Sequence, residues 1–241
     1  MCKLFNHFTS LFKRTACGVQ RSHAANSNLE PHYFKYKSLS GDSFKYFVEL
    51  LLNQKMYAAT FNQLNDPMEG MFLSKEFLNR SIRDQLYYNK VSYRIISLVK
   101  NTLEENKPNN MLMWSHYADE HRGCCIEFHF ANDEDNNNVH EIEYVDNNNI
   151  LQREIDLQII LRKKFVDWKY EKETRFLKEM RDDKFVDIII DKIYFGMRID
   201  DMYNEADQVN HTFYKELVNR LCPGVQLVFM TAQDFLEQHS K

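Results

Sequence analysis

Glycine and proline are scarce in this 241-residue chain, with six and four residues respectively. Neither G-x-G-x-x-G nor G-x-x-x-x-G-K-[ST] occurs, which excludes the common glycine-rich phosphate loops. The 31 Lys and Arg residues do not outnumber the 35 Asp and Glu residues, and the net charge is −4. Because phosphate neutralisation requires a basic surface, we expect no direct nucleic-acid binding. No apolar run is long enough to span a bilayer.

Cysteines are few and have no metal-type spacing. The five are Cys2, Cys17, Cys124, Cys125 and Cys222. Their odd number argues against a disulfide framework, and no C-x-x-C pair occurs that would indicate a zinc site. We therefore expect all five to be reduced and the protein to be cytoplasmic.

The chain is predicted to consist of an extension, residues 1–30, and a single domain, residues 31–241. The extension has no acidic residue before Glu30, and its apolar residues fall on one helical face (Leu4, Phe5, Phe8, Leu11 and Phe12). It is interpreted either as an amphipathic helix that touches a membrane surface or a partner, or as a flexible tail. Helices and strands follow one another in the domain without βαβ alternation. This order predicts an α+β fold with a curved or split, mainly antiparallel sheet flanked by helices.

The densest polar chemistry lies in residues 111–130, MLMWSHYADEHRGCCIEFHF. The spacing predicts a helix over 111–122, in which Trp114, Tyr117 and His121 share one face and Ser115 lies beside it. Gly123 is expected to end this helix, and a strand should follow over 124–130. This segment is interpreted either as a wall of a functional site or as a buried amphipathic helix with internally satisfied polar groups. A second helix is expected over about 151–164.

Two further segments carry candidate site residues. Asn65-Asp66-Pro67 is a strong turn signal, because both side chains can accept hydrogen bonds from backbone N–H groups. Around Trp168, the strand spacing of Glu171, Glu173 and Arg175 places these three side chains on one face. Such a row is either one wall of a cleft or a solvated set of ion pairs.

Four pieces of sequence carry a resemblance to a known family. They are FKYKSL from Phe34, NDP from Asn65 with Glu69, MWSHYADEHRG from Met113, and WKYEKETR from Trp168. Together, over residues 33–196, they resemble a large bacterial family of uncharacterised proteins known only as a domain of unknown function. This chain departs from the family pattern at Lys37, where the family usually has Arg. It also lacks the second serine of a Ser-Phe-Ser motif at Ser97.

The layout is also similar to abortive-infection (phage-resistance) proteins of the AbiG type and, more distantly, to ADP-ribosyltransferase folds. This likeness implies an enzyme in phage defence or toxin activity that uses NAD as its substrate. Glu173, Glu171 and Ser115 would be the catalytic residues, with Glu173 stabilising positive charge on the ribose. Residues implied in ligand binding are Tyr36, Asn65, Asp66, Trp114, His116, Tyr117, His121, Trp168 and Arg175. A small-molecule nucleotide is the expected partner.

Two other hypotheses stay open. In one, the protein is a non-catalytic recognition or regulatory module, and its His, Glu and Arg residues form a structural network. In the other, His116, Asp119, Glu120 and His121 hold a catalytic metal. On a helix, however, residues five apart lie about 140° from each other, so His116 and His121 would not converge. No metal is therefore expected.

Overall fold

The computed structural model describes residues 30–66, 80–101, 107–146, 156–180, 183–200 and 209–236. The chain divides into two units, Met1–Glu30 and Pro31–Lys241. The predicted extension lies outside the described residues except for Glu30. The second unit combines helices with an open, mainly antiparallel sheet of eight strands, so the predicted α+β class is confirmed.

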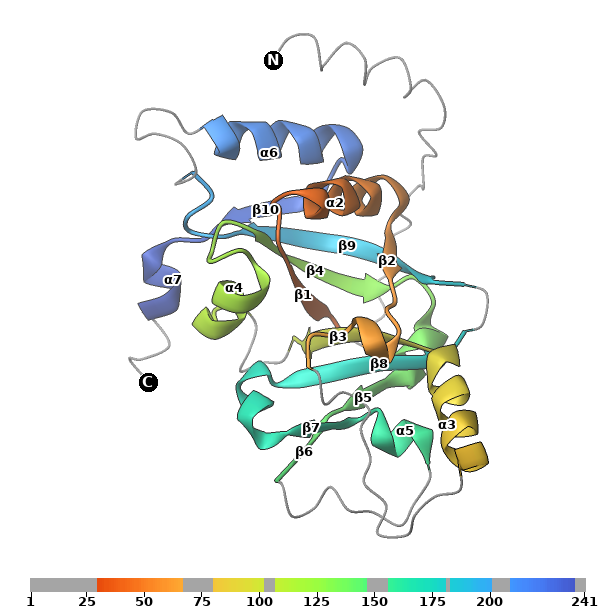
Figure 1. Ribbon diagram of the computed structural model, residues 1–241. Coiled ribbons are helices and arrows are strands. Elements are labelled where there is room, and N and C mark those ends of the chain that lie inside the picture. The colour runs from red at the N-terminus through yellow and green to blue at the C-terminus, as the bar shows by residue number, and fades with distance from the viewer. Residues whose placement is uncertain are drawn as a thin grey trace. The chain divides into compact units, whose positions relative to one another are not determined.

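The helices and strands of this unit follow in the order β1 (Tyr33–Lys37), α2 (Asp42–Asn53), β2 (Lys55–Tyr57), η1 (Phe61–Gln63), α3 (Arg80–Ser92), β3 (Tyr93–Lys100), α4 (Met111–Tyr117), β4 (Cys124–Phe130), η2 (Asp133–Asn138), β5 (Val139–Glu141), β6 (Glu143–Val145), α5 (Leu157–Ile160), β7 (Lys163–Phe165), η3 (Val166–Glu171), β8 (Glu173–Glu179), β9 (Phe185–Phe195), α6 (Val209–Leu221), β10 (Gln226–Phe229) and α7 (Ala232–Leu236). Figure 1 shows their arrangement.

The large sheet has the strand order β10-β9-β4-β1-β3-β8-β5. Its remaining strand, β2, pairs with residues 185–187 at the start of β9. Only β9 and β10 run parallel in it. β1 pairs with β4 over all five of its residues, but its register with β3 is limited to Tyr33↔Lys100 and Phe34↔Val99. The sheet therefore opens between β1 and β3 beyond Phe34. β6 and β7 form a separate parallel pair.

Apolar side chains cover both faces of the sheet. On one face, α2 and α6 pack through Phe47 and Val218 onto a core that includes Phe128 and Phe195. On the other face, α4 and α7 bring Trp114 and Phe235 against the sheet (Figure 1). The alternation of side chains along each strand explains this division, because successive residues of β1 and β4 point to opposite faces. We call these the α2/α6 face and the α4/α7 face.

The predicted helix over residues 111–122 is wrong in its second half. α4 ends at Tyr117, and the next residues Asp119, Glu120 and His121 have positive φ angles of 51°, 51° and 70°. This tight turn brings the His121 amide back to the Trp114 carbonyl at 3.3 Å. The turn packs closely on Gly196, where a β-carbon would lie 2.1 Å from the His121 carbonyl oxygen. Tertiary packing thus overrides helical periodicity here.

The helix predicted over about 151–164 is also different in the structure. α5 covers only Leu157–Ile160, Lys163–Phe165 form the strand β7, and residues 151–155 lie outside the described residues. The physical reason is that β7 pairs with β6. The backbone groups of residues 163–165 are therefore satisfied by strand pairing instead of by helical hydrogen bonds.

Candidate functional site

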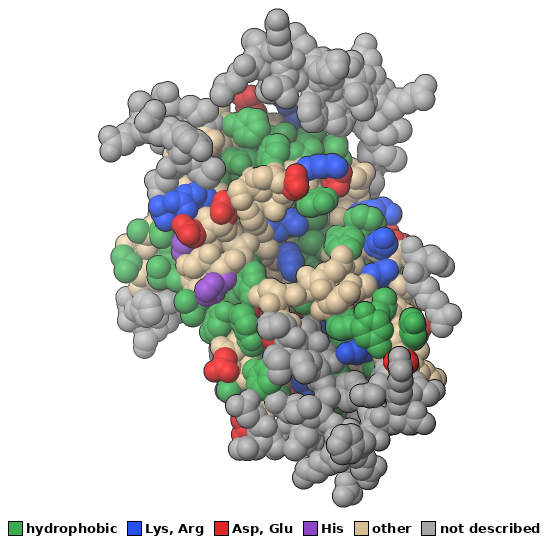
Figure 2. Space-filling model, viewed as in Figure 1, with side chains coloured by type: hydrophobic (Ala, Val, Ile, Leu, Met, Phe, Trp, Pro, Cys, Tyr) green, Lys and Arg blue, Asp and Glu red, His purple; other side chains and the backbone are tan. Residues whose placement is uncertain are grey.

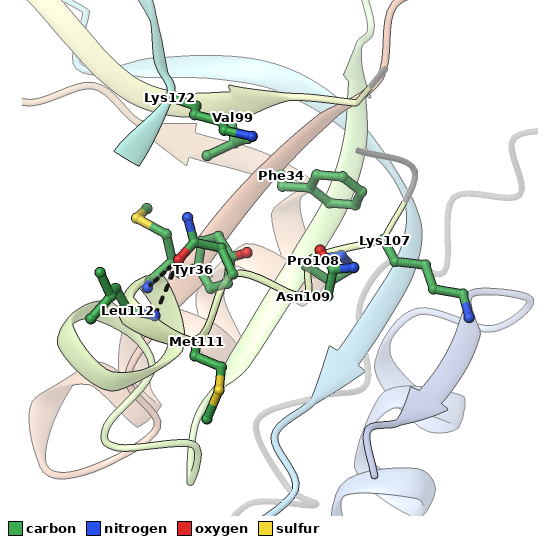
Figure 3. Close-up of a pocket in the computed structure, with 11 residues that line it drawn as sticks. Phe34, Tyr36, Val99, Lys107, Pro108, Asn109, Met111, Leu112 and Lys172 are labelled. Carbon is green, nitrogen blue, oxygen red and sulfur yellow. Dashed lines mark hydrogen bonds between the residues drawn. The ribbon is translucent and has the colours of Figure 1, made fainter. Parts of the chain in front are cut away.

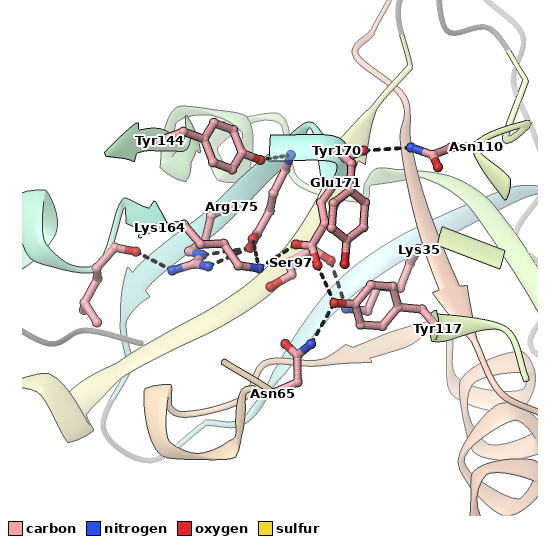
Figure 4. Close-up of polar contacts among 12 residues, drawn as sticks. Lys35, Asn65, Ser97, Asn110, Tyr117, Tyr144, Lys164, Tyr170, Glu171 and Arg175 are labelled. Atoms are coloured by element: carbon pink, nitrogen blue, oxygen red, sulfur yellow. Dashed lines mark hydrogen bonds and ion pairs between the residues drawn. The ribbon is translucent and has the colours of Figure 1, made fainter. Parts of the chain in front are cut away.

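Four buried charged residues lie together where β7, η3 and β8 meet. They are Lys164, Glu171, Glu173 and Arg175, called the charge network below, and none is more than 5% exposed. The Lys164 ammonium donates to both glutamates, at 3.0 Å to Glu173. Arg175 donates from Nε and Nη2 to one oxygen of Glu173 at 2.9 and 2.8 Å (Figure 4). Two positive and two negative charges therefore compensate each other inside the protein.

The surroundings keep Glu173 ionised. Burial by itself raises the pKa of this carboxyl, but the charges of Arg175 and Lys164 and a hydrogen bond with Ser97 bring it down to about 2. Burial lowers the pKa of Lys164, and the two glutamates more than offset that effect, so the pKa is raised. Removing one partner from such a buried pair would leave a charge without compensation.

The backbone at Lys172 explains how both glutamates turn inward. Lys172 ends η3 in the left-handed conformation, with φ 46° and ψ 44°. Its neighbours Glu171 and Glu173 then both reach Lys164. Such a conformation is unfavourable for a residue with a β-carbon and is retained only where packing enforces it. The Lys164 ammonium also lies 4.8 Å from the centre of the Trp168 ring.

α4 connects the charge network to the predicted turn at Asn65. The Tyr117 hydroxyl donates to Glu171 and accepts a 2.7 Å hydrogen bond from the Asn65 side chain. Burial and the bonded Glu171 carboxylate together hold the pKa of Tyr117 far above its usual range. The hydroxyl is therefore protonated at neutral pH and acts as a hydrogen-bond donor.

Lys35 reaches into the opening between β1 and β3. Its ammonium donates to the Ser97 carbonyl at 2.9 Å. Burial, followed by the nearby charge of Lys37, lowers the pKa of Lys35 to about 8, although Glu173 and Glu171 act in the opposite direction. In the space-filling view, Lys and Arg side chains lie in a hollow near the centre of the face shown (Figure 2). A lysine with a lowered pKa is a feature of functional sites.

A pocket of about 250 Å³ lies at the start of α4. We call it the α4 pocket, and its lining residues are Phe34, Tyr36, Val99, Lys107, Pro108, Asn109, Asn110, Met111, Leu112, Met113 and Lys172 (Figure 3). Asn110 caps α4 by accepting from the amides of the second and third helical residues, and its side chain also donates to the Tyr170 carbonyl at 2.8 Å. This bond ties the pocket to the segment that carries the charge network.

The structure brings several predicted site residues together. Asn65, Tyr117, Glu171, Glu173 and Arg175 belong to one connected set of hydrogen bonds, in which Lys164 joins the two glutamates. The predicted ligand-binding residue Trp168 lies beside this set, and Tyr36 lines the α4 pocket.

Other predicted residues lie elsewhere. Ser115 is exposed, and its hydroxyl donates back to the Met111 carbonyl of its own helix. His116 is also exposed, but its ring lies near those of Tyr117 and Tyr170, at 6.2 and 5.9 Å between ring centres. Trp114 is fully buried, its indole N–H donates to the Pro108 carbonyl, and the buried His121 ring stacks on it at 5.9 Å. The remaining candidate is Asp66, which is 5% exposed.

Sequence reasoning missed Lys35, Lys164 and Tyr144. The Tyr144 hydroxyl accepts from the Glu173 amide at 2.8 Å, and Lys164 bridges the two glutamates. No local pattern distinguishes Lys164 from its neighbour Lys163, because the burial of Lys164 depends on how β7 packs against η3. Lys35 belongs to the first family-like motif, FKYKSL. Its position in the opening between β1 and β3 depends on strand pairing, which the motif does not reveal.

Comparison with known proteins gives one family. Residues 113–176 match the model of a family described as "Protein of unknown function (DUF2971)". The matched segment runs from α4 into β8 and contains Tyr117 and all four residues of the charge network. No curated protein and no solved structure matches the chain. The comparisons thus show similarity to a family of unknown function over this segment of the chain. In the described part of the chain, no helix has the length and apolar character to cross a membrane.

Proposed function

We propose that this protein is a recognition module that binds a small nucleotide-like ligand in the α4 pocket, while the charge network holds the pocket in shape. The observation that carries this proposal is the composition of the pocket. Phe34 and Tyr36 supply aromatic surface, Asn109 supplies an amide, and Lys172 supplies a cation at the edge. A flat ring with an attached anionic group is the ligand chemistry that such a lining recognises.

The size of the pocket limits the ligand. Pockets for drug-sized molecules have volumes of about 300–1,000 Å³, and the α4 pocket has about 250 Å³. One ring and the group attached to it would fill this space. A dinucleotide such as NAD would leave half of its structure outside, so we expect a mononucleotide to bind about as well as NAD.

ADP-ribosyl transfer from NAD is the second candidate function. It is favoured by the pairing of Glu173 with Val99 of the pocket wall, which puts the network directly behind the pocket. Against it stands the state of the Glu173 carboxylate, because Arg175 and Lys164 occupy its two oxygens. This carboxylate would have to leave both partners before it could stabilise charge on a ribose. Binding therefore ranks ahead of transfer, and either activity would suit a phage-defence protein of the AbiG type.

Calorimetry and thermal shift with nicotinamide mononucleotide, AMP and NAD test the proposal. The informative variant is Lys172→Asn, because Asn removes the charge and tolerates the left-handed backbone. The matched control is Lys169→Asn, at an exposed position outside the pocket lining. We expect binding of at least one mononucleotide, weakened about five- to tenfold in Lys172→Asn and unchanged in the control.

Three results would decide against this function. No binding of any of the three ligands would remove the proposal, and equal weakening in both variants would place the ligand elsewhere. Release of nicotinamide from NAD that is lost in Glu173→Gln, with the stability of the protein retained, would establish the transferase instead.

A further inference from the structure

A second polar cluster lies at the edge where β1, β4 and β9 run side by side. His32 immediately precedes β1, His129 belongs to β4, and Asp191 belongs to β9. Oδ2 of Asp191 lies 3.0 Å from Nδ1 of His32 and 2.9 Å from Nδ1 of His129. The candidate ligand atoms of the three residues all lie within 4.8 Å of one another. Two imidazoles therefore lie on either side of one carboxylate oxygen.

Strand pairing places the two histidines opposite each other. Tyr33 of β1 pairs with Phe128 of β4 in antiparallel register. The preceding residue His32 is therefore opposite the following residue His129, and the centres of the two rings are 5.4 Å apart. Neighbouring side chains on antiparallel strands come this close by geometry alone.

A β-bulge brings Asp191 to the same place. Glu127 of β4 pairs with Lys192 of β9, but the next residue Phe128 pairs with Ile190. Asp191 is thus the extra residue, without a register partner between these two pairs. Phe128 and Ile190 belong to the core on the α2/α6 face, and Asp191 is turned toward the histidines. Bulges of this kind re-aim side chains and are enriched next to functional sites.

The hydrogen bonds of the cluster leave one nitrogen unexplained. His129 Nδ1 makes a hydrogen bond to Asp191. His32 Nδ1 lies at a similar distance, but it is buried and is among the described side-chain nitrogens that have no hydrogen-bond partner of acceptable geometry. A buried unsatisfied nitrogen of this kind calls for an explanation, and a bound ion is one that fits its position between ligand-type atoms.

We propose that His32, His129 and Asp191 bind a divalent transition-metal ion such as Zn²⁺, Mn²⁺ or Fe²⁺. Metal bonds to imidazole and carboxylate measure about 2.0–2.2 Å, so ligand atoms in a tetrahedral or octahedral shell lie about 2.8–3.6 Å apart. The distances from Asp191 to each histidine already lie in that range, and the ligand atoms of the two histidines, within 4.8 Å of each other, have to approach to complete the shell. Two histidines and one carboxylate are a common set for zinc and for non-haem iron.

Glu127 is a second carboxylate close to the cluster, and it has partners of its own. Glu127 lies behind His32, with 3.7 Å between its carboxylate and Nδ1. The same carboxylate accepts from Tyr194 at 2.8 Å and from Asn101 at 3.2 Å, and Lys192 lies 3.4 Å away. Glu127 is thereby neutralised and fixed in position, which leaves Asp191 as the charged ligand.

The cluster leaves room for further ligands of the metal. The His32, His129 and Asp191 side chains are 32%, 16% and 25% exposed. Three protein ligands with access to solvent leave coordination positions open for water or for an anionic group. Phe34 of the α4 pocket is two residues from His32, which corresponds to about 7 Å along an extended chain. The metal would therefore lie close to the pocket, although its binding does not depend on the proposed nucleotide.

The test is metal binding by the full chain after treatment with a chelator. Zn²⁺, Mn²⁺ and Co²⁺ are added separately, and binding is followed by calorimetry, by metal content after gel filtration and by the visible spectrum of Co²⁺. The variants are His129→Gln and Asp191→Asn. The matched control is His211→Gln, whose partner Asp200 lies 3.4 Å away in a pair that has no third ligand among the described residues.

We expect one equivalent of at least one of these metals to bind wild type and the control equally, and at least tenfold more weakly to both variants. No stoichiometric binding of any of the three, or unchanged binding by both variants, would overturn the proposal. Because a variant at the bulge can lose its fold, Mn²⁺ is also added to wild type and the histidine NMR signals are recorded. Broadening of the His32 and His129 signals ahead of His211 is expected, and uniform broadening contradicts the site.

Discussion

Replacement of Glu173 by Gln separates a structural network from a catalytic glutamate. The substitution leaves Arg175 and Lys164 buried beside a neutral amide, one end of which would have to face a cation. Loss of one partner from a buried ion pair costs about 3–5 kcal/mol. For a domain of this size, each kcal/mol corresponds to about 2–4 °C, so we expect the melting temperature to fall by about 6–20 °C.

The pH dependence of the stability measures the interaction of Glu173 with its cationic partners in a second way. The pKa of Glu173 falls from 4.5 to about 2 in the folded protein, which corresponds to about 3 kcal/mol. Since the folded pKa is depressed, this stabilisation is present above about pH 5 and is lost as the pH falls toward 2. About 1 kcal/mol of it is lost by pH 3.5. The difference in stability between wild type and Glu173→Gln should shrink by that amount.

Urea unfolding at pH 7 and at pH 3.5 measures both effects. The control is Glu179→Gln, the same change at an exposed position of the same strand β8. Its cost should be below about 1 kcal/mol, as for exposed ion pairs and hydrogen bonds. If Glu173→Gln were as stable as this control, and equally so at both pH values, the charge network would not be structural.

Three further predictions concern Tyr117, Lys35 and Gly196. Tyr117→Phe removes a hydroxyl that bonds to the charge network and should lower stability by about 1–3 kcal/mol in urea unfolding; no change would mean that the hydroxyl is solvated. Competitive acetylation should give Lys35 a titration midpoint near pH 8, and a midpoint at the ordinary value for lysine, about 10.4, would contradict the lowered pKa. Gly196→Ala should lower the melting temperature markedly, because a β-carbon there would lie 2.1 Å from the His121 carbonyl and overpacking costs about 1–3 kcal/mol; a variant as stable as wild type would show that this turn yields.

Much of the secondary structure was determined by local sequence. The strand over residues 124–130 follows from its alternation, and Gly123 precedes it as expected. Glu173 and Arg175 lie on one face because a strand repeats every two residues, whereas Glu171 belongs to η3 and turns inward because Lys172 ends η3 in the left-handed conformation. These features depend only on residues close to one another in the chain, so sequence patterns could reveal them.

Only the tertiary structure decided which polar groups meet and in what surroundings. Lys164 becomes the bridge of the network because β7 packs against η3, and His121 leaves the helix because its turn docks on Gly196. The approach of His32 and His129 to Asp191 depends on strand register and on one bulge, across separations of 62 residues or more. Burial and register are long-range properties. The same residue types on an exposed surface would be ordinary solvated groups, and composition does not distinguish the two cases.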